Sequence, residues 1–315
     1  MFSIGFTIER TIRISKDIKT IFNMVSDFNT WRVWSPWLCQ EPGCPLNITG
    51  NPGETGHRQA WNGQQIGLGE MILDTCRPNH QLGYQLSFIR PWKSRATVGF
   101  RFEKEAGGTR VTWTMQGSLP FYLFFMKKMM AAWIGCDYDR GLAMLKELAE
   151  TGTVLSQTAA HGVTDREGLH YVGRKQACTM DDIGAVMENV FTDLHDQITN
   201  RRLPQPDIFF SIYHKCDMVR RHCEFTAGCG YYTPPEKLEI SGMAHGRLPA
   251  HKAVHVTHTG PYRHLGNAWA TAMGMQRSQK LKPNKAVPMY EIYVNDPQAT
   301  DEAEIHTDIF IPVKA

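Results

Sequence analysis

The C-terminal half of the chain carries an internal repeat at a spacing of 80 residues, and this repeat constrains the fold more than any other feature. Residues 210–213 align with residues 290–293, and the stretch 171–177 aligns with 251–257. Segments with helical periodicity of apolar residues, 180–202 and 262–278, lie between the matching pieces. Each copy therefore predicts the order strand, helix, strand, strand. Two such copies in one sheet would face each other about a pseudo-twofold axis, with a groove between them as the natural pocket.

One strand of the second copy carries an isolated carboxylate. Residues 289–294 are rich in Tyr, Ile and Val and are bounded by prolines, which is typical of a strand. Side chains alternate across a strand, so Tyr290 and Ile292 share one face while Glu291 and Tyr293 share the other. If the first face packs on helices, Glu291 looks out from an aromatic floor. A carboxylate half-removed from water is costly without a partner, which indicates a site. Pairing of Glu291 with a Lys or Arg on a solvated face is the alternative.

Composition narrows the classes of function. The chain has 315 residues, more than one core usually organises, and 42% hydrophobic with 21% charged residues is typical of a soluble globular protein. A net charge of +3 without charge blocks gives no case for nucleic acid. The apolar run 120–135 is too short for a membrane span and contains Lys127 and Lys128. Glu9 and Arg10 interrupt any signal peptide, so we expect a cytoplasmic protein with no membrane contact.

Eight cysteines without a CxxC pair do not indicate a disulfide scaffold. Cys216, Cys223 and Cys229, with His214 and His222 close to them in sequence, give the only hint of a metal site. Reduced cysteines in strands explain the pattern more simply. We therefore expect no metal and no cofactor.

The N-terminal half predicts a meander of strands followed by a long helix. Between residues 56 and 117, apolar residues alternate with polar or small ones in several short runs, and such meanders are antiparallel with one face buried. Residues 123–150 show apolar side chains at steps of three or four, as expected for a helix. A single helix against a strongly curved sheet would leave room for a ligand between them.

Residues 6–150 resemble the START-like, polyketide cyclase superfamily, also called SRPBCC, which has a helix-grip fold. The resemblance rests on Asp27 and Trp31, the motif 34–37, and the segments 61–63, 67–69, 108–113 and 141–146. It implies an internal cavity for an apolar molecule. Our candidates for the lining are Trp113, Phe100, Tyr84, Phe88 and Trp61, with Arg10 as a polar group. No acid–base pair can be assigned there.

Residues 168–314 resemble the GyrI-like small-molecule-binding domain, which is also the effector-binding domain of AraC-type and multidrug-responsive MerR-type regulators. The resemblance rests on Pro249 and Ala250, and on the segments 258–262, 290–297 and 307–312. The acidic residue that contacts ligands in that family falls on Glu291. Its aromatic walls would come from Tyr171, Phe210, Trp269 and Tyr293, with Ser211 opposite Glu291 and His255 as a further wall.

The resulting prediction is an α+β protein of two domains, residues 1–150 and 167–315, joined by a linker over 151–166. The regulators of the GyrI-like family carry a helix-turn-helix segment, and here a START-like domain stands in its place. We expect a sensor or sequestering protein for a lipophilic cationic or electrophilic molecule, bound by aromatic rings and a carboxylate. Two other functions stay open: a hydrolase of cyclopropane-type electrophiles with Glu291 as acid or base, and a gyrase-inhibitor-like module that binds a protein partner.

Overall fold

The computed structural model describes residues 3–200, 202–235 and 242–314. The chain divides into two compact units, Met1–Val154 and Leu155–Ala315. Each unit contains one antiparallel sheet together with helices, so the α+β prediction is confirmed. None of the helices in the described part combines the length and the apolar character that crossing a bilayer requires.

The first unit is a meander sheet that holds one long helix. Its strands follow the order β1-β7-β6-β5-β4-β3-β2, so every neighbouring pair after β1 is also consecutive in sequence. Their bounds are β1 (Ser3–Ile14), β2 (Leu46–Thr49), β3 (Arg58–Asn62), β4 (Leu68–Arg77), β5 (Gln81–Arg90), β6 (Ser94–Glu105) and β7 (Gly108–Pro120). The first strand lies at one edge of the sheet and pairs with β7 over its full length, from Ser3 opposite Pro120 to Ile14 opposite Thr109.

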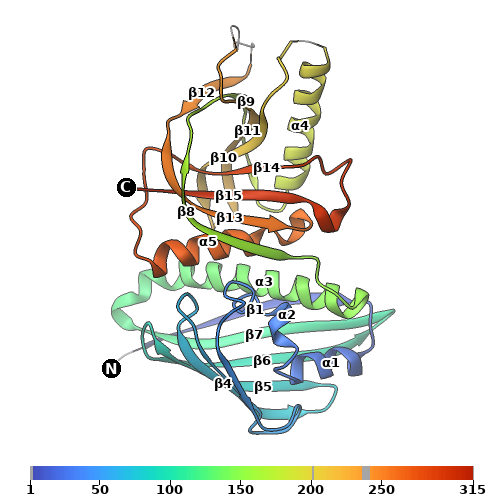
Figure 1. The fold of residues 1–315 in the computed structure, drawn as a ribbon. Coiled ribbons are helices and arrows are strands. Elements are labelled where there is room, and N and C mark those ends of the chain that lie inside the picture. Colours follow the sequence, from blue (N-terminus) through green and yellow to red (C-terminus); the bar gives the residue numbers. More distant parts are fainter. Residues whose placement is uncertain (1–2, 201, 236–241, 315) are drawn as a thin grey trace. The chain divides into compact units, whose positions relative to one another are not determined.

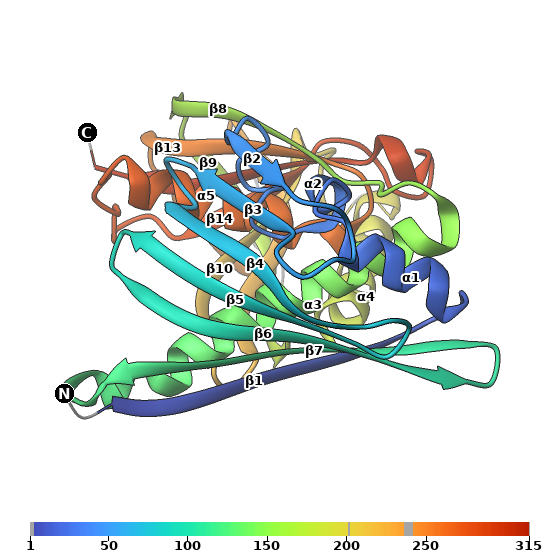
Figure 2. The same cartoon turned by 90° about the horizontal axis from the view of Figure 1, so that it is seen from below.

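Two helix ends of this unit have recognisable caps, the start of α1 and the end of α3. Helix α1 (Ile18–Ser26) begins at Asp17, whose Oδ1 accepts a hydrogen bond of 3.0 Å from the Thr20 N–H. A short helix α2 (Trp31–Trp34) and a 3-10 turn η1 (Phe121–Met126) precede the long helix α3 (Lys127–Thr151), which ends at Gly152 in the left-handed conformation. Helix α3 packs along β1, as Figure 1 and Figure 2 show, and this confirms the helix-grip prediction.

The second unit contains the two predicted copies in one sheet. The strand order is β12-β9-β11-β10-β14-β15-β13-β8, so the copy β9-α4-β10-β11 and the copy β13-α5-β14-β15 meet at the pair β10–β14. The bounds are β8 (Gln157–Arg166), β9 (Leu169–Thr179), α4 (Ile183–Thr199), β10 (Ile208–Asp217), β11 (His222–Tyr231), β12 (Ala244–Leu248), β13 (His251–Thr259), η2 (Tyr262–His264), α5 (Gly266–Ser278), β14 (Met289–Tyr293), η3 (Glu302–Glu304) and β15 (His306–Val313). The repeat seen in the sequence is therefore a structural repeat.

The expected linker over 151–166 is wrong for most of its length. Residues Gln157–Arg166 form β8, which pairs with β13 from Thr259 to His251 and shifts register near His255. Strand β8 lies at the edge of the sheet, where no other strand of the described part pairs with its outer side, and none of its residues is buried. Its sequence therefore lacks the apolar alternation that marks a strand with one buried face.

The two faces of the second sheet carry different clusters of apolar side chains. On the face covered by the helices, one cluster gathers around α4 and includes Val190 and Phe225, and another gathers around α5 and includes Ala268 and Val256. A third cluster, which includes Phe210, Ile212, Tyr290, Ile292 and Phe310, lies on the opposite face. The sheet is therefore buried on both sides at its centre, where the two copies meet.

Candidate functional site

Glu291 lies at the centre of the second sheet, on the face that the helices cover. Strand β14 pairs with β10 so that Glu291 is directly opposite Ser211, as the repeat predicts. Trp269 of α5 contacts the Glu291 carboxylate, whereas Tyr290 and Ile292 belong to the cluster on the other face. The condition considered in the sequence analysis, that the helices cover Tyr290 and Ile292, therefore does not hold. Both faces of this short strand are rich in large apolar side chains, so the alternation alone does not identify the helix side.

Three side chains donate hydrogen bonds to the Glu291 carboxylate. The hydroxyl groups of Tyr213 and Tyr293 lie 2.8 Å and 2.6 Å from Oε1, and the indole Nε1 of Trp269 lies 3.0 Å from Oε2. All three are donors, and a carboxylate that is ionised offers acceptors alone. The arrangement therefore matches a charged carboxylate rather than a neutral acid, without any cationic side chain among these donors.

The two tyrosines are equivalent positions of the repeat. Tyr213 and Tyr293 each lie two residues after the central position, which is Ser211 in the first copy and Glu291 in the second. The Tyr293 oxygen also lies 2.9 Å from Ser211 Oγ. Since a hydroxyl group has a single proton, Ser211 donates to Tyr293 when Tyr293 donates to Glu291. We did not name Tyr213 as a site residue from the sequence, although its match to Tyr293 in the repeat was the available signal.

Burial raises the pKa of Glu291 above its ordinary value, and the hydrogen bonds from Tyr293, Tyr213 and Trp269 oppose that shift. The side chain is 1% exposed, so the desolvation is nearly complete. The pKa values of Tyr213 and Tyr293 are also raised by burial and by the neighbouring carboxylate, which keeps both phenols protonated as donors. The charged form of Glu291 therefore costs free energy through burial, and the three hydrogen bonds offset part of that cost.

Aromatic rings and one methionine enclose this network. The ring of Tyr213 meets Trp269 edge to face at 5.3 Å, and Tyr293 meets Phe191 of α4 at 5.2 Å in the same manner. Tyr262 of η2 contacts Tyr293 at 5.8 Å, and its pKa is raised to about 12 by burial and by the Glu291 charge. The sulfur of Met187 lies 3.4 Å from the Tyr293 oxygen. Side chains from both helices therefore form the walls.

The rim of this enclosure is partly open to solvent. Tyr262 is 40% exposed, and Trp269 and Phe191 are half-buried, while the carboxylate below them is closed off. Phe191 and Tyr262 lie in the two segments predicted as helical, 180–202 and 262–278, and the sequence analysis did not name them as site residues. Trp269 is the only donor to Oε2 among the described contacts.

Three predicted wall residues lie on the opposite face of the sheet, away from Glu291. Phe210 is opposite Ile292 in the β10–β14 pair, and Tyr171 packs its ring against Phe210 at 5.5 Å. His255 stacks on Phe310 at 4.6 Å, and its Nε2 lies 3.1 Å from Asp308 Oδ1. The prediction that Tyr171, Phe210 and His255 share a cleft with Glu291 is therefore wrong. The family resemblance suggested Tyr171 and Phe210 as walls, and the strand pairing places all three residues on the other face.

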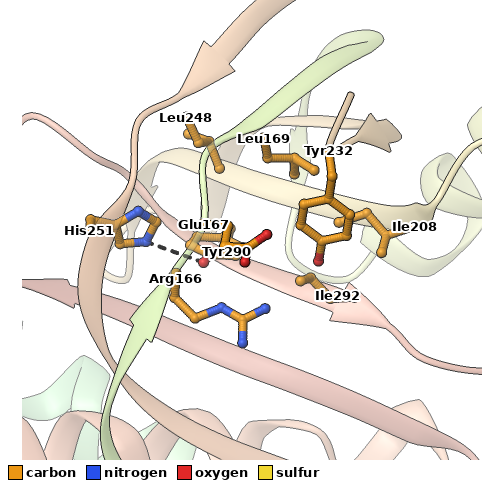
Figure 3. Close-up of a pocket in the computed structure, with 9 residues that line it drawn as sticks. All are labelled: Arg166, Glu167, Leu169, Ile208, Tyr232, Leu248, His251, Tyr290 and Ile292. Carbon is orange, nitrogen blue, oxygen red and sulfur yellow. Dashed lines mark hydrogen bonds between the residues drawn. The ribbon is translucent and has the colours of Figure 1, made fainter. Parts of the chain in front are cut away.

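A small pocket is present on that opposite face. Figure 3 shows residues from several strands around it, including Arg166 of β8 and Tyr290 of β14, whose hydroxyl group lies 3.2 Å from His251 Nε2. Its volume of about 10 Å³ is enough for one water molecule. The pKa of Tyr290 is raised to about 12, mainly by burial, so its phenol is neutral. This pocket is too small for the organic ligand that the sequence predicts.

In the first unit, the residues expected to line a cavity pack closely on other rings. Trp113 stacks on Tyr138 of α3 at 3.9 Å and on Phe100 at 4.9 Å, and it also meets the rings of Trp31, Trp34 and Trp37. Tyr84 contacts Phe100 at 6.2 Å, and its hydroxyl group donates to the Val25 carbonyl at 2.8 Å. In this structure the space around Trp113 is therefore occupied by protein.

The remaining N-terminal candidates lie at other places on the sheet. Trp61 and Phe88 form an edge-to-face pair at 5.7 Å on β3 and β5. Arg10 on β1 reaches α3, where its Nε lies 3.0 Å from Asp139 Oδ1. This ion pair connects the sheet to the helix, which is a structural role for Arg10. Among the described residues, no group of three or more His, Cys, Asp or Glu side chains is placed to hold a metal ion.

Each of the two units matches a known protein family. Residues 163–314 match the GyrI-like small molecule binding domain, and residues 5–150 match the family of polyketide cyclases, dehydrases and lipid transport proteins. The two family resemblances found in the sequence are therefore confirmed. No curated protein gives a significant match to this chain.

Three of the solved structures that resemble parts of this chain are described below. Protein MLL2253 from Mesorhizobium loti has 15% identity and a TM-score of 0.36 over 45% of this chain and 96% of its own. The Aha1 dimer from Colwellia psychrerythraea has 19% identity and a TM-score of 0.36 over 47% of this chain and 98% of its own. EcmrR in a DNA complex has 16% identity and a TM-score of 0.41 over 62% of this chain and 72% of its own.

Proposed function

Because the chain combines a domain of the polyketide cyclase and lipid transport type with a GyrI-like small molecule binding domain, we propose that it binds a lipophilic organic cation at Glu291. The observation that carries the proposal is a buried carboxylate held by neutral donors and rings. A buried charge of this kind is usually paired with a cationic side chain, and here the hydrogen-bond donors among the described residues are two phenols and an indole. A ligand cation would supply the counter-charge.

The aromatic rings around the carboxylate also suit a cationic ligand. Rings of Phe191, Tyr213, Tyr262, Trp269 and Tyr293 come from both helices and both central strands, and their faces attract a cation by about 1–2 kcal/mol when water is excluded. Ligand entry displaces Trp269 and replaces its hydrogen bond by the charge pair. The protein then acts in the cytoplasm as a sensor or a sequestering protein for cationic toxic compounds.

The test is a titration of the full chain with tetraphenylphosphonium and with a neutral aromatic molecule of similar size, triphenylphosphine oxide. For a charge pair in a partly dry site, Glu291→Gln costs about 2–3 kcal/mol of binding free energy, which is a loss of roughly 30- to 150-fold in affinity for the cation. Affinity for the neutral molecule changes less than about threefold. Equal losses for both molecules would contradict the proposal.

A second function, hydrolysis of a reactive electrophile, is favoured by one specific observation. A carboxyl group with a raised pKa, 2.6 Å and 2.8 Å from two phenols, is suited to move a proton during attack by water. Catalysis would consume the ligand, and Glu291→Gln would abolish its consumption. Incubation of the ligand with excess wild-type protein, followed by mass analysis, separates the two functions, since a binding protein returns the ligand unchanged.

A further inference from the structure

Three cysteines of the second unit lie side by side across three neighbouring strands. Cys216 on β10 is directly opposite Cys223 on β11, and Cys223 is directly opposite Cys178 on β9. Residues directly opposite in an antiparallel pair point to the same face of the sheet. The row therefore brings three thiols together at one end of the sheet, beside the hairpin that joins β10 to β11.

The sulfur atoms of Cys216 and Cys223 lie 3.1 Å apart. This separation is shorter than ordinary contact between two thiols, and only a small movement is needed to reach the S–S bond length of about 2.05 Å. The connecting hairpin already fixes the two strands, because Asp217 Oδ1 accepts hydrogen bonds from the Val219 and Arg220 N–H groups at 3.0 Å and 2.9 Å. A bond between the sulfurs would therefore form without a rearrangement of the backbone.

The two thiols differ in access to solvent. Cys216 is exposed, whereas Cys223 is 3% exposed. A hydrogen bond from the Cys223 thiol lowers the pKa of Cys216, and the same interaction raises the pKa of Cys223. This is the division of roles found in dithiols that react with oxidants, with one accessible sulfur that attacks and one protected sulfur that resolves.

We propose that Cys216 and Cys223 are a redox-active dithiol that a hydroperoxide converts reversibly to an intramolecular disulfide. The Cys216 sulfur attacks the hydroperoxide, so that an S–O bond forms, the O–O bond breaks and an alcohol, or water from hydrogen peroxide, leaves. The Cys223 sulfur then attacks the resulting sulfenic acid, the S–S bond forms and water leaves with the Cys223 proton. Two electrons pass from the sulfurs to the peroxide, and an external thiol reverses the change by exchange.

The dithiol lies near the cation site but does not depend on it. Tyr213, the Glu291 partner, is three residues before Cys216 on the same strand, and the ring of Phe225, two residues after Cys223, lies 6.2 Å from that of Tyr213. The Glu291 charge opposes the lowering of the Cys216 pKa and adds to the rise in the Cys223 pKa. Because the proposal concerns the sulfurs alone, it stands or falls separately from cation binding.

Trypsin and mass analysis test the proposal on the full chain. Cleavage after Lys215, Arg220 and Arg221 places Cys216 and Cys223 on different peptides, which stay joined only by a disulfide. Reduced protein treated with one equivalent of hydrogen peroxide, and then with iodoacetamide, should yield this joined pair and two fewer alkylated thiols. Dithiothreitol should restore both thiols.

Substitutions of two of the three neighbouring cysteines, Cys216 and Cys178, supply the controls. Cys216→Ser should abolish the joined pair and leave Cys223 as a free thiol, while Cys178→Ser, in the same row, should leave the disulfide intact. A Cys178–Cys223 link in the wild type would overturn the proposal, as would oxidation of Cys216 to sulfinic acid without a joined pair. Circular dichroism of each variant shows whether a negative result comes from loss of the fold, and the wild-type peptide map alone still decides the question.

Discussion

The hydrogen bond from Tyr213 to Glu291 should stabilise the protein more at high pH than at low pH. Tyr213→Phe removes the donor that lies 2.8 Å from Oε1 and leaves the ring in place. A hydrogen bond to a charged group contributes about 1.5–3 kcal/mol, and one between neutral groups about 0.5–1.5 kcal/mol. Because of this difference of about 1–2 kcal/mol, Tyr213→Phe should raise the pKa of Glu291 further.

The sign follows from proton binding. The pKa of Glu291 in the folded protein is already raised above its ordinary value of 4.5, so the folded state binds its proton more tightly than the unfolded state does. Stability from this group is therefore present at low pH and is lost as pH rises through the folded pKa. Tyr213→Phe raises that pKa further, so its deficit against the wild type grows from about 1 kcal/mol in acid to about 2–3 kcal/mol above the folded pKa.

Urea unfolding of the wild type and Tyr213→Phe across about pH 4.5 to about pH 8.5 measures this deficit. Tyr231→Phe is the matched control, because the Tyr231 hydroxyl group donates to the neutral carbonyl of Pro204 at 3.0 Å. The unfolding free energy that Tyr231→Phe loses relative to the wild type should be independent of pH. If the curves for Tyr213→Phe and Tyr231→Phe run parallel, the reasoning that Tyr213 holds a charged carboxylate is refuted.

Three further predictions concern other positions. Burial, with the neighbouring His264, lowers the pKa of His258 from 6.5 to about 4, so the folded protein favours neutral His258. Relative to His258→Asn, the wild type should lose roughly 3 kcal/mol of unfolding free energy as the pH falls between these two pKa values. Trp269→Phe removes the donor to Oε2. Because ligand entry replaces this hydrogen bond, the variant should bind the cation about threefold to tenfold more tightly in a titration. Phe210→Leu on the opposite face should leave the affinity unchanged. Trp113→Ala should cost about 3–5 kcal/mol in urea unfolding, because it removes the ring that packs on Tyr138 and Phe100.

The order of elements in the second unit follows from the sequence because it depends on local signals. The spacing of 80 residues identifies both copies and places Ser211 opposite Glu291, as the strand pairing confirms. Strand β8 was missed because an edge strand with no buried residue carries no alternation to detect. Periodicity reports burial, so an element without a buried side leaves little trace in the sequence.

The composition of the candidate site was only partly predictable. Alternation showed that Glu291 and Tyr293 share a face, but the side that the helices take depends on how the chain crosses over the sheet, which no local pattern encodes. Tyr171 and Phe210 were chosen as aromatic residues, although the repeat already aligned Phe210 with Tyr290, on the face away from Glu291. Tyr213 could have been named from its equivalence to Tyr293.

Proton release on ligand binding tests the central claim most directly. A cation that pairs with Glu291 favours the ionised carboxylate, so binding must expel the proton that the raised pKa retains. Calorimetric titration of tetraphenylphosphonium in two buffers of different ionisation enthalpy, at several values from about pH 4.5 to about pH 8, counts these protons. The account predicts release of up to about one proton in acid, falling to none at high pH, and no release from Glu291→Gln. Cation binding by the wild type without proton release at any of these pH values would contradict it.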